Sequence, residues 1–157
     1  MKNISWLFKI SPQLKTVIVG YYNDLVEKAQ VVEFSEKLLE SGYYEDELEV
    51  LAGSELYEEE VFQKIMYSKE RKMNLEEKEK EIKKIELAEL YEVNSEKKSG
   101  DELREKLEKI YVRYNYPVEF SSFSKYSGIL LTPEEALRKA IDFLEKWIRN
   151  AENKQEM

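Results

Sequence analysis

Eight carboxylates stand close together in the segment from Tyr43 to Glu60, which contains no basic residue. Three tyrosines lie among them. Tyrosines supply rigid contact area at protein interfaces, and exposed carboxylates steer the encounter with a basic partner. The segment therefore predicts a partner-binding surface. Its predicted residues are Tyr43, Tyr44, Glu45, Asp46, Glu47, Glu49, Glu55, Tyr57, Glu58, Glu59 and Glu60.

A local explanation competes with binding for these carboxylates. Residues 31–68 carry eleven acidic and two basic residues, a net charge of −9, while the whole chain carries −8. The runs 45–47 and 58–60 each stand at an expected helix N-terminus, where the helix dipole favours each negative charge by about 0.3–1 kcal/mol. That effect does not require eight charges, so both interpretations stay open.

Enzyme chemistry is restricted by two missing residue types. The chain has no cysteine and no histidine, which excludes thiolate nucleophiles, histidine-based triads and Cys/His zinc sites. Phosphate-loop and nucleophile-elbow motifs are also absent from the sequence. Carboxylate pairs at helical spacing, such as Glu36 with Glu40, could hold a metal ion, but 33 acidic residues produce such pairs by chance. We expect no enzymatic activity, no cofactor and no metal.

The charge and hydropathy of the chain narrow the class of partner. A net charge of −8 without a strongly basic stretch argues against nucleic acid. No window approaches the roughly 20 apolar residues of a membrane-spanning helix. The N-terminal apolar run is too short for a signal peptide. We therefore expect a cytoplasmic protein whose partner is a protein, namely a basic toxin domain, and neither nucleic acid nor a membrane.

The elements that must position the acidic segment are predicted to be helices. With 157 residues and only eight Gly and Pro, the chain predicts an all-α fold, a single domain over residues 1–157 of about seven helices packed as antiparallel helical hairpins. The tail 152–157 is expected to fray. The predicted helices cover residues 12–25, 28–41, 46–52, 58–69, 74–93 and 132–151, and a further one starts at Ser99, includes Tyr111 and ends before Pro117.

Capping patterns support several of these helix starts. Ser11-Pro12 predicts a cap followed by the first helical residue. Capping boxes are predicted where Glu follows three residues after Asn74, Ser99 and Thr132. The Lys- and Glu-rich run 68–84 predicts a solvated helix.

Aromatic residues gather between residues 109 and 126, six of the chain's nineteen. Pro117 disfavours helix at the residue before it and predicts a helix end. We expect these rings to close the core, because clustered aromatic side chains usually bury their area. A second predicted core cluster joins the last helix to this region. Its residues are Ile110, Tyr111, Ile141, Leu144 and Trp147.

The aromatic pattern resembles a bacterial family described as domain of unknown function 2247. The shared residues are Ile110, Tyr111, Tyr114, Tyr116, Pro117, Phe120, Phe123 and Tyr126, with Ile4, Trp6 and Gly20 near the N-terminus and a helix that stops at Gly42. The turn after Gly20 departs from the family's Ser-Pro and reads NDLVEKA. The resemblance covers Ile4 to Tyr126. It implies the fold more than the function, with a loose association to immunity proteins and no catalytic residues.

The expected function is that of an immunity protein, which binds and neutralises a cognate bacterial toxin through the acidic surface. Two alternatives stay open: a helical adaptor without a toxin partner, and a carboxylate-dependent enzyme. An adaptor requires an exposed apolar groove, and an enzyme requires several acids that converge in a pocket.

Overall fold

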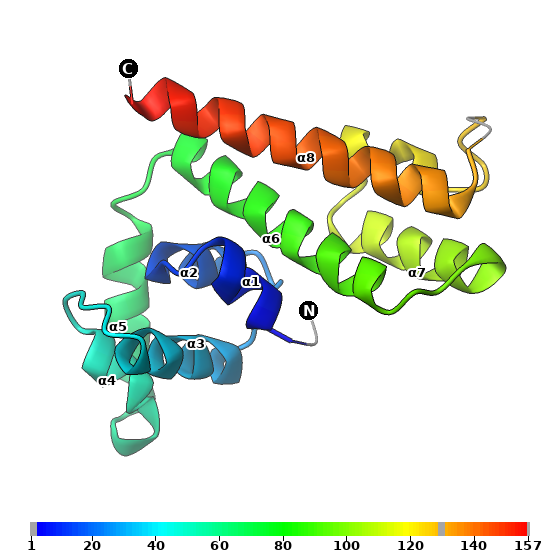
Figure 1. The fold of residues 1–157 in the computed structure, drawn as a ribbon. Helices are drawn as coiled ribbons and strands as arrows, with labels where there is room; N and C mark the ends of the chain where they lie inside the picture. The colour runs from blue at the N-terminus through cyan, green and yellow to red at the C-terminus, as the bar shows by residue number, and fades with distance from the viewer. Residues whose placement is uncertain (1–2, 129–130, 157) are drawn as a thin grey trace. The chain divides into compact units, whose positions relative to one another are not determined.

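The chain is built from helices, as the computed structural model shows for residues 3–128 and 131–156 (Figure 1). No strand occurs in this described part, so the predicted all-α fold is confirmed. The packing divides the chain into two compact units, Met1–Ile85 and Glu86–Met157. Helix α6 (Leu75–Ser95) contributes residues to both units. A single domain over residues 1–157 stays a prediction.

The first unit holds six helical elements before α6. They are α1 (Ser5–Ile10), α2 (Leu14–Tyr22), α3 (Lys28–Glu40), α4 (Leu48–Ala52), the 3₁₀-helix η1 (Ser54–Leu56) and α5 (Glu59–Glu70). Helix α2 packs against α3 and α5, and α3 packs against α4. These contacts build a core of large apolar side chains. Its fully buried members include Leu7, Leu14, Ile18, Phe34, Leu48, Leu51, Phe62 and Met66.

The second unit pairs the last part of α6 with three later elements. They are α7 (Gly100–Arg113), the 3₁₀-helix η2 (Val118–Phe123) and α8 (Pro133–Glu156). Glu89 of α6 pairs with Arg113 of α7, and Glu96 pairs with Lys106. Residue numbers that rise on one helix and fall on the other mean that α6 and α7 run antiparallel, as predicted (Figure 1). The fraying of residues 152–157 stays a prediction.

Two of the predicted caps form with their side-chain hydrogen bonds. Asn74 Oδ1 accepts a hydrogen bond of 2.8 Å from the Glu77 backbone N–H. Thr132 Oγ1 accepts one of 3.1 Å from the Glu135 N–H, and the Thr132 hydroxyl donates one of 2.9 Å to the Glu135 carboxylate. The side chain of Ser99 makes no capping bond, although α7 starts where predicted.

The N-terminal helices differ from the prediction. Helix α2 begins at Leu14 instead of Pro12, because Gln13 is extended at φ −136° and ψ 132°. It ends at Tyr22, so Leu25 lies beyond the helix in which it was predicted. Helix α1 was not predicted, although Asn3 Oδ1 accepts a hydrogen bond of 2.8 Å from Ser5 N–H at its start.

The aromatic cluster closes the core only in part. Phe120 and Phe123 are fully buried and stack with their ring centroids 4.6 Å apart. By contrast, 58% of Tyr116 and 83% of Tyr126 are exposed, so the prediction that these two rings are buried is wrong. The predicted helix end before Pro117 is confirmed. Helix α7 ends at Arg113, and Asn115 and Tyr116 then take positive φ.

The second predicted cluster is also mixed. Leu144 and Ile110 are buried, whereas Ile141, Trp147 and Tyr111 are half-buried. The Lys- and Glu-rich run 68–84 does not form one helix as predicted, because α5 ends at Glu70 and α6 begins at Leu75, and the run is solvated only in part. Three of its charged residues, Lys80, Glu81 and Lys84, are buried. Among the described residues, no helix has both the length and the apolar character that a membrane span requires.

Candidate protein-binding surface

The acidic segment starts at the capped end of α3. The Tyr43 N–H donates to Leu38 O at 3.0 Å, and the Gly42 N–H donates to Leu39 O at 3.1 Å. These two bonds form a Schellman motif, which needs a left-handed residue at its turn. Gly42 supplies it with φ +84°. The helix end therefore fixes the backbone from which Tyr43 and Tyr44 project.

Short elements carry the rest of the segment. Glu47 precedes α4 in a left-handed conformation at φ 68°. Helix α4 has five residues and is followed directly by Gly53 and η1. Tyr57 is extended, and Glu58 then leads into the first turn of α5. Frequent changes of direction keep the polar side chains of the segment at the surface.

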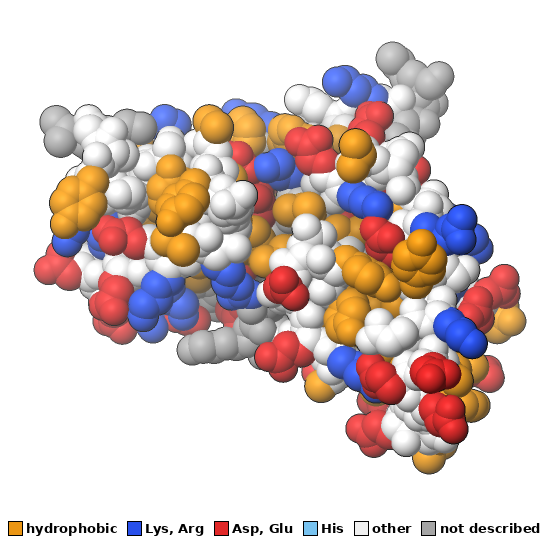
Figure 2. Space-filling view, turned by 180° about the vertical axis from the view of Figure 1, so that it is seen from behind, with side chains coloured by type: hydrophobic (Ala, Val, Ile, Leu, Met, Phe, Trp, Pro, Cys, Tyr) orange, Lys and Arg blue, Asp and Glu red, His pale blue; other side chains and the backbone are white. Residues whose placement is uncertain are grey.

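All eleven predicted residues are exposed in the structure. Tyr44 exposes 81% of its area, and Tyr43 and Tyr57 each expose about half. Leu56, which the sequence analysis did not select, is 88% exposed. Figure 2 shows acidic and hydrophobic side chains side by side at lower right, over the region of α4 and α5. The surface is thus acidic with apolar anchors among the charges.

Two of the eight acids are engaged by lysines of the same unit. Glu59 forms an ion pair with Lys28 and accepts a hydrogen bond of 3.0 Å from Gln63. The hydrogen bond from Lys28 lowers the pKa of the Glu59 carboxyl below its usual value. Glu45 Oε1 lies 3.5 Å from Lys69 Nζ.

Among the described residues, side-chain hydrogen bonds and ion pairs reach only Glu45 and Glu59 of the segment's acids, so the six others have none. They are Asp46, Glu47, Glu49, Glu55, Glu58 and Glu60.

Helix-dipole stabilisation applies to part of the segment. Glu59 and Glu60 lie in the first turn of α5, a helix of 12 residues, and Glu58 precedes it. Near α4 only Glu49 is in the first turn, and that helix is a single short turn with a small dipole. Stabilisation by the helix dipole therefore explains the acidic residues 58–60 better than the acidic residues 45–47.

A pocket of about 390 Å³ lies at the N-terminal edge of this surface. Its apolar lining comes from Leu14, Leu38 and Leu48, which are themselves almost fully buried. Tyr43 and Tyr44 line it as well. No sequence pattern predicts this pocket, because residues from α2, α3 and α4 meet there only after folding.

A buried polar cluster in the first unit offers different chemistry. The hydroxyls of Ser11 and Thr16 are hydrogen-bonded at 2.8 Å, and the Thr16 hydroxyl donates to Glu81 Oε1 at 2.6 Å. Lys84 Nζ lies 3.3 Å from both Ser11 Oγ and Glu81 Oε1. A serine beside a lysine can act as a nucleophile with its base when the lysine is neutral.

This cluster is better explained as a structural element. Lys84 Nζ donates its hydrogen bond to Ser11 Oγ and forms an ion pair with Glu81, so it holds the serine hydroxyl as an acceptor and not as a nucleophile. Ser11 is 1% exposed, so a substrate does not reach its hydroxyl. Glu81 Oε2 is buried and accepts no hydrogen bond within the described residues. The cluster therefore fixes α6 against the start of α2 and does not form an active site.

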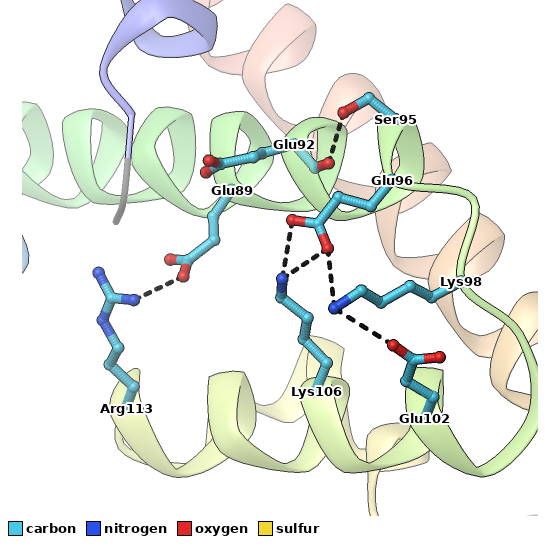
Figure 3. Close-up of polar contacts among 8 residues, drawn as sticks. All are labelled: Glu89, Glu92, Ser95, Glu96, Lys98, Glu102, Lys106 and Arg113. Carbon is cyan, nitrogen blue, oxygen red and sulfur yellow. Dashed lines mark hydrogen bonds and ion pairs between the residues drawn. The ribbon is translucent and has the colours of Figure 1, made fainter.

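In the second unit, charged residues line the contact between α6 and α7 (Figure 3). Lys106 Nζ donates to both oxygens of Glu96 at 2.7 Å. Lys98 Nζ lies 3.3 Å from the same carboxylate. These contacts, with the Lys106 hydrogen bond as the largest effect, lower the pKa of Glu96.

About two turns away, Arg113 Nη1 donates to Glu89 Oε1 at 2.6 Å, and the Tyr114 hydroxyl donates to Glu89 Oε2. Burial raises the pKa of the Glu89 carboxyl, against the opposing effect of the Tyr114 hydrogen bond. Glu89, Glu96 and Glu102 each pair with a base here, and the pairs Glu89–Arg113 and Glu96–Lys106 tie the end of α6 to α7. Within residues 3–128 and 131–156, no group of three or more acidic side chains is placed to hold a metal ion.

The sequence of the chain matches a known protein family over most of its length. Residues 7–152 match the family described as an uncharacterized protein conserved in bacteria, DUF2247. The chain belongs to this family. The DUF2247 match covers both compact units and includes the whole acidic surface. No curated protein and no solved structure matches the chain.

Proposed function

We propose that this DUF2247 protein binds a basic protein through the exposed surface formed by residues 43–60, and that it acts as an immunity protein that neutralises a bacterial toxin. One observation carries the proposal. Six carboxylates of this surface have no partner among the described residues, while exposed tyrosines stand between them. The loose association of the resembling family with immunity proteins favours a toxin as the partner.

In this proposal the carboxylates of the acidic surface take the place of the phosphates of a nucleic acid. A toxin that cleaves nucleic acid needs a basic site for its substrate, and an acidic protein surface can occupy that site. Carboxylates that are not neutralised by their own lysines supply the attraction, which acts mainly on the association rate. Exposed aromatic side chains supply the contact area that slows dissociation.

The test begins with the product of the gene beside this one. Its growth inhibition is measured with and without this protein, and binding is measured by calorimetry at about 0.1 M and about 1 M salt. The screening length falls from about 10 Å to about 3 Å over that range. Protection from toxicity, with an affinity that decreases as salt rises, is the expected result. Absence of both would overturn the proposal.

A charge-reversed variant locates the surface. Asp46, Glu55 and Glu58 are changed to Lys, while Glu59 is retained because it pairs with Lys28. The matched control changes three exposed acids of α3 to Lys, namely Glu33, Glu36 and Glu40. Both variants gain the same charge, so a general effect of net charge acts on both. We expect slower association, by about tenfold or more, only for the variant in residues 43–60.

A further inference from the structure

We propose that the pocket beside Tyr43 and Tyr44 receives an arginine side chain of the basic partner. The inference rests on the proposed function, because the arginine belongs to the protein that the acidic surface binds. It adds a specific anchoring point to a surface otherwise defined by long-range charge.

The shape of the pocket suits a long side chain with a charged end. Leu14, Leu38 and Leu48 form its buried floor, and half-buried Pro12 with the rings of Tyr43 and Tyr44 gives the accessible apolar wall that can hold a methylene stem. Tyr43 and Tyr44, both exposed, bring aromatic rings to the same pocket. Arginine stacks on aromatic faces and is enriched among the residues that contribute most to interfaces.

The charges at this edge favour a cation. Glu45 lines the pocket, and its carboxylate forms only a long ion pair, with Oε1 3.5 Å from Lys69 Nζ. The next residues add three exposed acids, Asp46, Glu47 and Glu49. Four carboxylates against Lys69 and Lys15 leave a net charge of −2. A planar guanidinium can pair with such a carboxylate while its face stacks on a ring.

Lys15 is the residue that separates this proposal from its closest rival. Lys15 is half-buried and also lines the pocket, so a partner's carboxylate could in principle bind there instead. The two occupants respond oppositely to the loss of the Lys15 charge. An arginine is repelled by that ammonium and binds at least as well without it, whereas a carboxylate loses its counter-ion.

The experiment uses small probes and the full chain. N-acetyl-arginine amide is titrated against the protein by NMR, with the methyl signals of Leu38 and Leu48 as reporters. The uncharged isostere N-acetyl-citrulline amide and the anion N-acetyl-leucine serve as comparison probes. We expect saturable shifts with the arginine probe, weaker binding of the citrulline probe and no preference for the anion.

Three variants identify the site. Gln13→Trp fills the pocket from an exposed residue whose side chain makes no capping bond, so the fold is retained. It should abolish the shifts. Tyr44→Ala should weaken the arginine probe by about two- to fivefold, the effect of an exposed cation–π contact. Lys15→Met should leave its affinity unchanged or raise it. Loss of binding in Lys15→Met, equal binding of citrulline, or no shift with arginine would each overturn the proposal.

The whole partner separates this inference from the proposed function. If Gln13→Trp binds the partner as the natural protein does, while the Asp46, Glu55 and Glu58 variant binds weakly, the pocket is not an anchor and the proposed function stands. If the charge-reversed variant binds normally, the acidic surface is not the interface, and the probe titration alone decides what the pocket accepts.

Discussion

Lys84 Nζ lies 3.3 Å from Glu81 Oε1, and both side chains are buried, with 4% and 0% of their area exposed. Two charges that share a buried site depend on each other, because removal of either leaves the other without compensation. The hydroxyls of Ser11 and Thr16 complete the cluster and would lose hydrogen bonds as well.

The first prediction follows from this pair. Lys84→Met should lower the free energy of unfolding by about 3–5 kcal/mol, since the Glu81 charge remains buried without its partner. The double variant Glu81→Leu, Lys84→Met should lose much less than the sum of the two single variants. Urea unfolding of the four proteins measures this coupling. Additive losses would contradict an ion pair within the cluster.

The second prediction concerns Gly20 of α2. A Cβ added there would lie 2.6 Å from Val26 Cγ2 and 3.1 Å from Ile85 Cδ1. Alanine has the better helix propensity, by about 1 kcal/mol, but a forced overlap in a packed core costs about 1–3 kcal/mol. Gly20→Ala should therefore destabilise the protein, which thermal unfolding would show as a lower melting temperature. The double variant with Val26→Ala should lose less stability than the sum of the two single variants, and additive losses would place the strain elsewhere.

The third prediction concerns the core of the second unit. Leu144 is fully buried on α8, whereas its neighbour Phe143 is 45% exposed. Leu144→Ala should cost about 2–5 kcal/mol of unfolding free energy, as lost transfer energy and a cavity add together. Phe143→Ala removes a larger side chain and should nevertheless cost less. The order of the two values in chemical denaturation is the measurement, and the reverse order would contradict this packing.

The fourth prediction concerns two carboxyls, Glu89 on α6 and Glu96 directly after the end of that helix. The pKa of Glu89 is raised by burial, and the pKa of Glu96 is lowered by its contact with Lys106. Carboxyl ¹³C NMR should show Glu89 titrating at higher pH than Glu96. The contribution of Glu96 to stability is present above its unfolded pKa and is lost as pH falls through its folded pKa. Lys106→Met should move the Glu96 titration upward. The same titration point in both proteins would contradict the assigned cause.

Helix ends were predicted well where a capping residue lies at the end of the helix. Asn74 and Thr132 form the predicted capping bonds, and Gly42 ends α3 in the left-handed conformation that glycine allows. Such bonds join residues a few positions apart, so the sequence contains them in full. Helix α1 escaped prediction because it has only six residues and its N-cap is Ile4, which has no side chain that can cap a helix.

Contacts between residues far apart in the chain could not be predicted from the sequence. Lys84 and Glu81 stand in a run of alternating charges that is typical of a solvated helix. They are buried because Ser11 and Thr16, more than 60 residues earlier, supply their hydrogen bonds. For the candidate surface, composition predicted which residues are exposed. It could not predict that Lys28 and Lys69 engage two of the acids, or that leucines from three helices make a pocket beside Tyr44.

The closed end of α3 has a thermodynamic consequence for any molecule that touches Tyr43. Its backbone N–H already donates to Leu38 O, so folding has ordered this residue before a partner arrives. Fixing the backbone of one disordered residue would cost about 1–2 kcal/mol at the moment of binding. Association at Tyr43 avoids that loss of entropy. Disruption of the turn, for example by Gly42→Val, should appear in calorimetry as a less favourable binding entropy, even where every contact with the partner is retained.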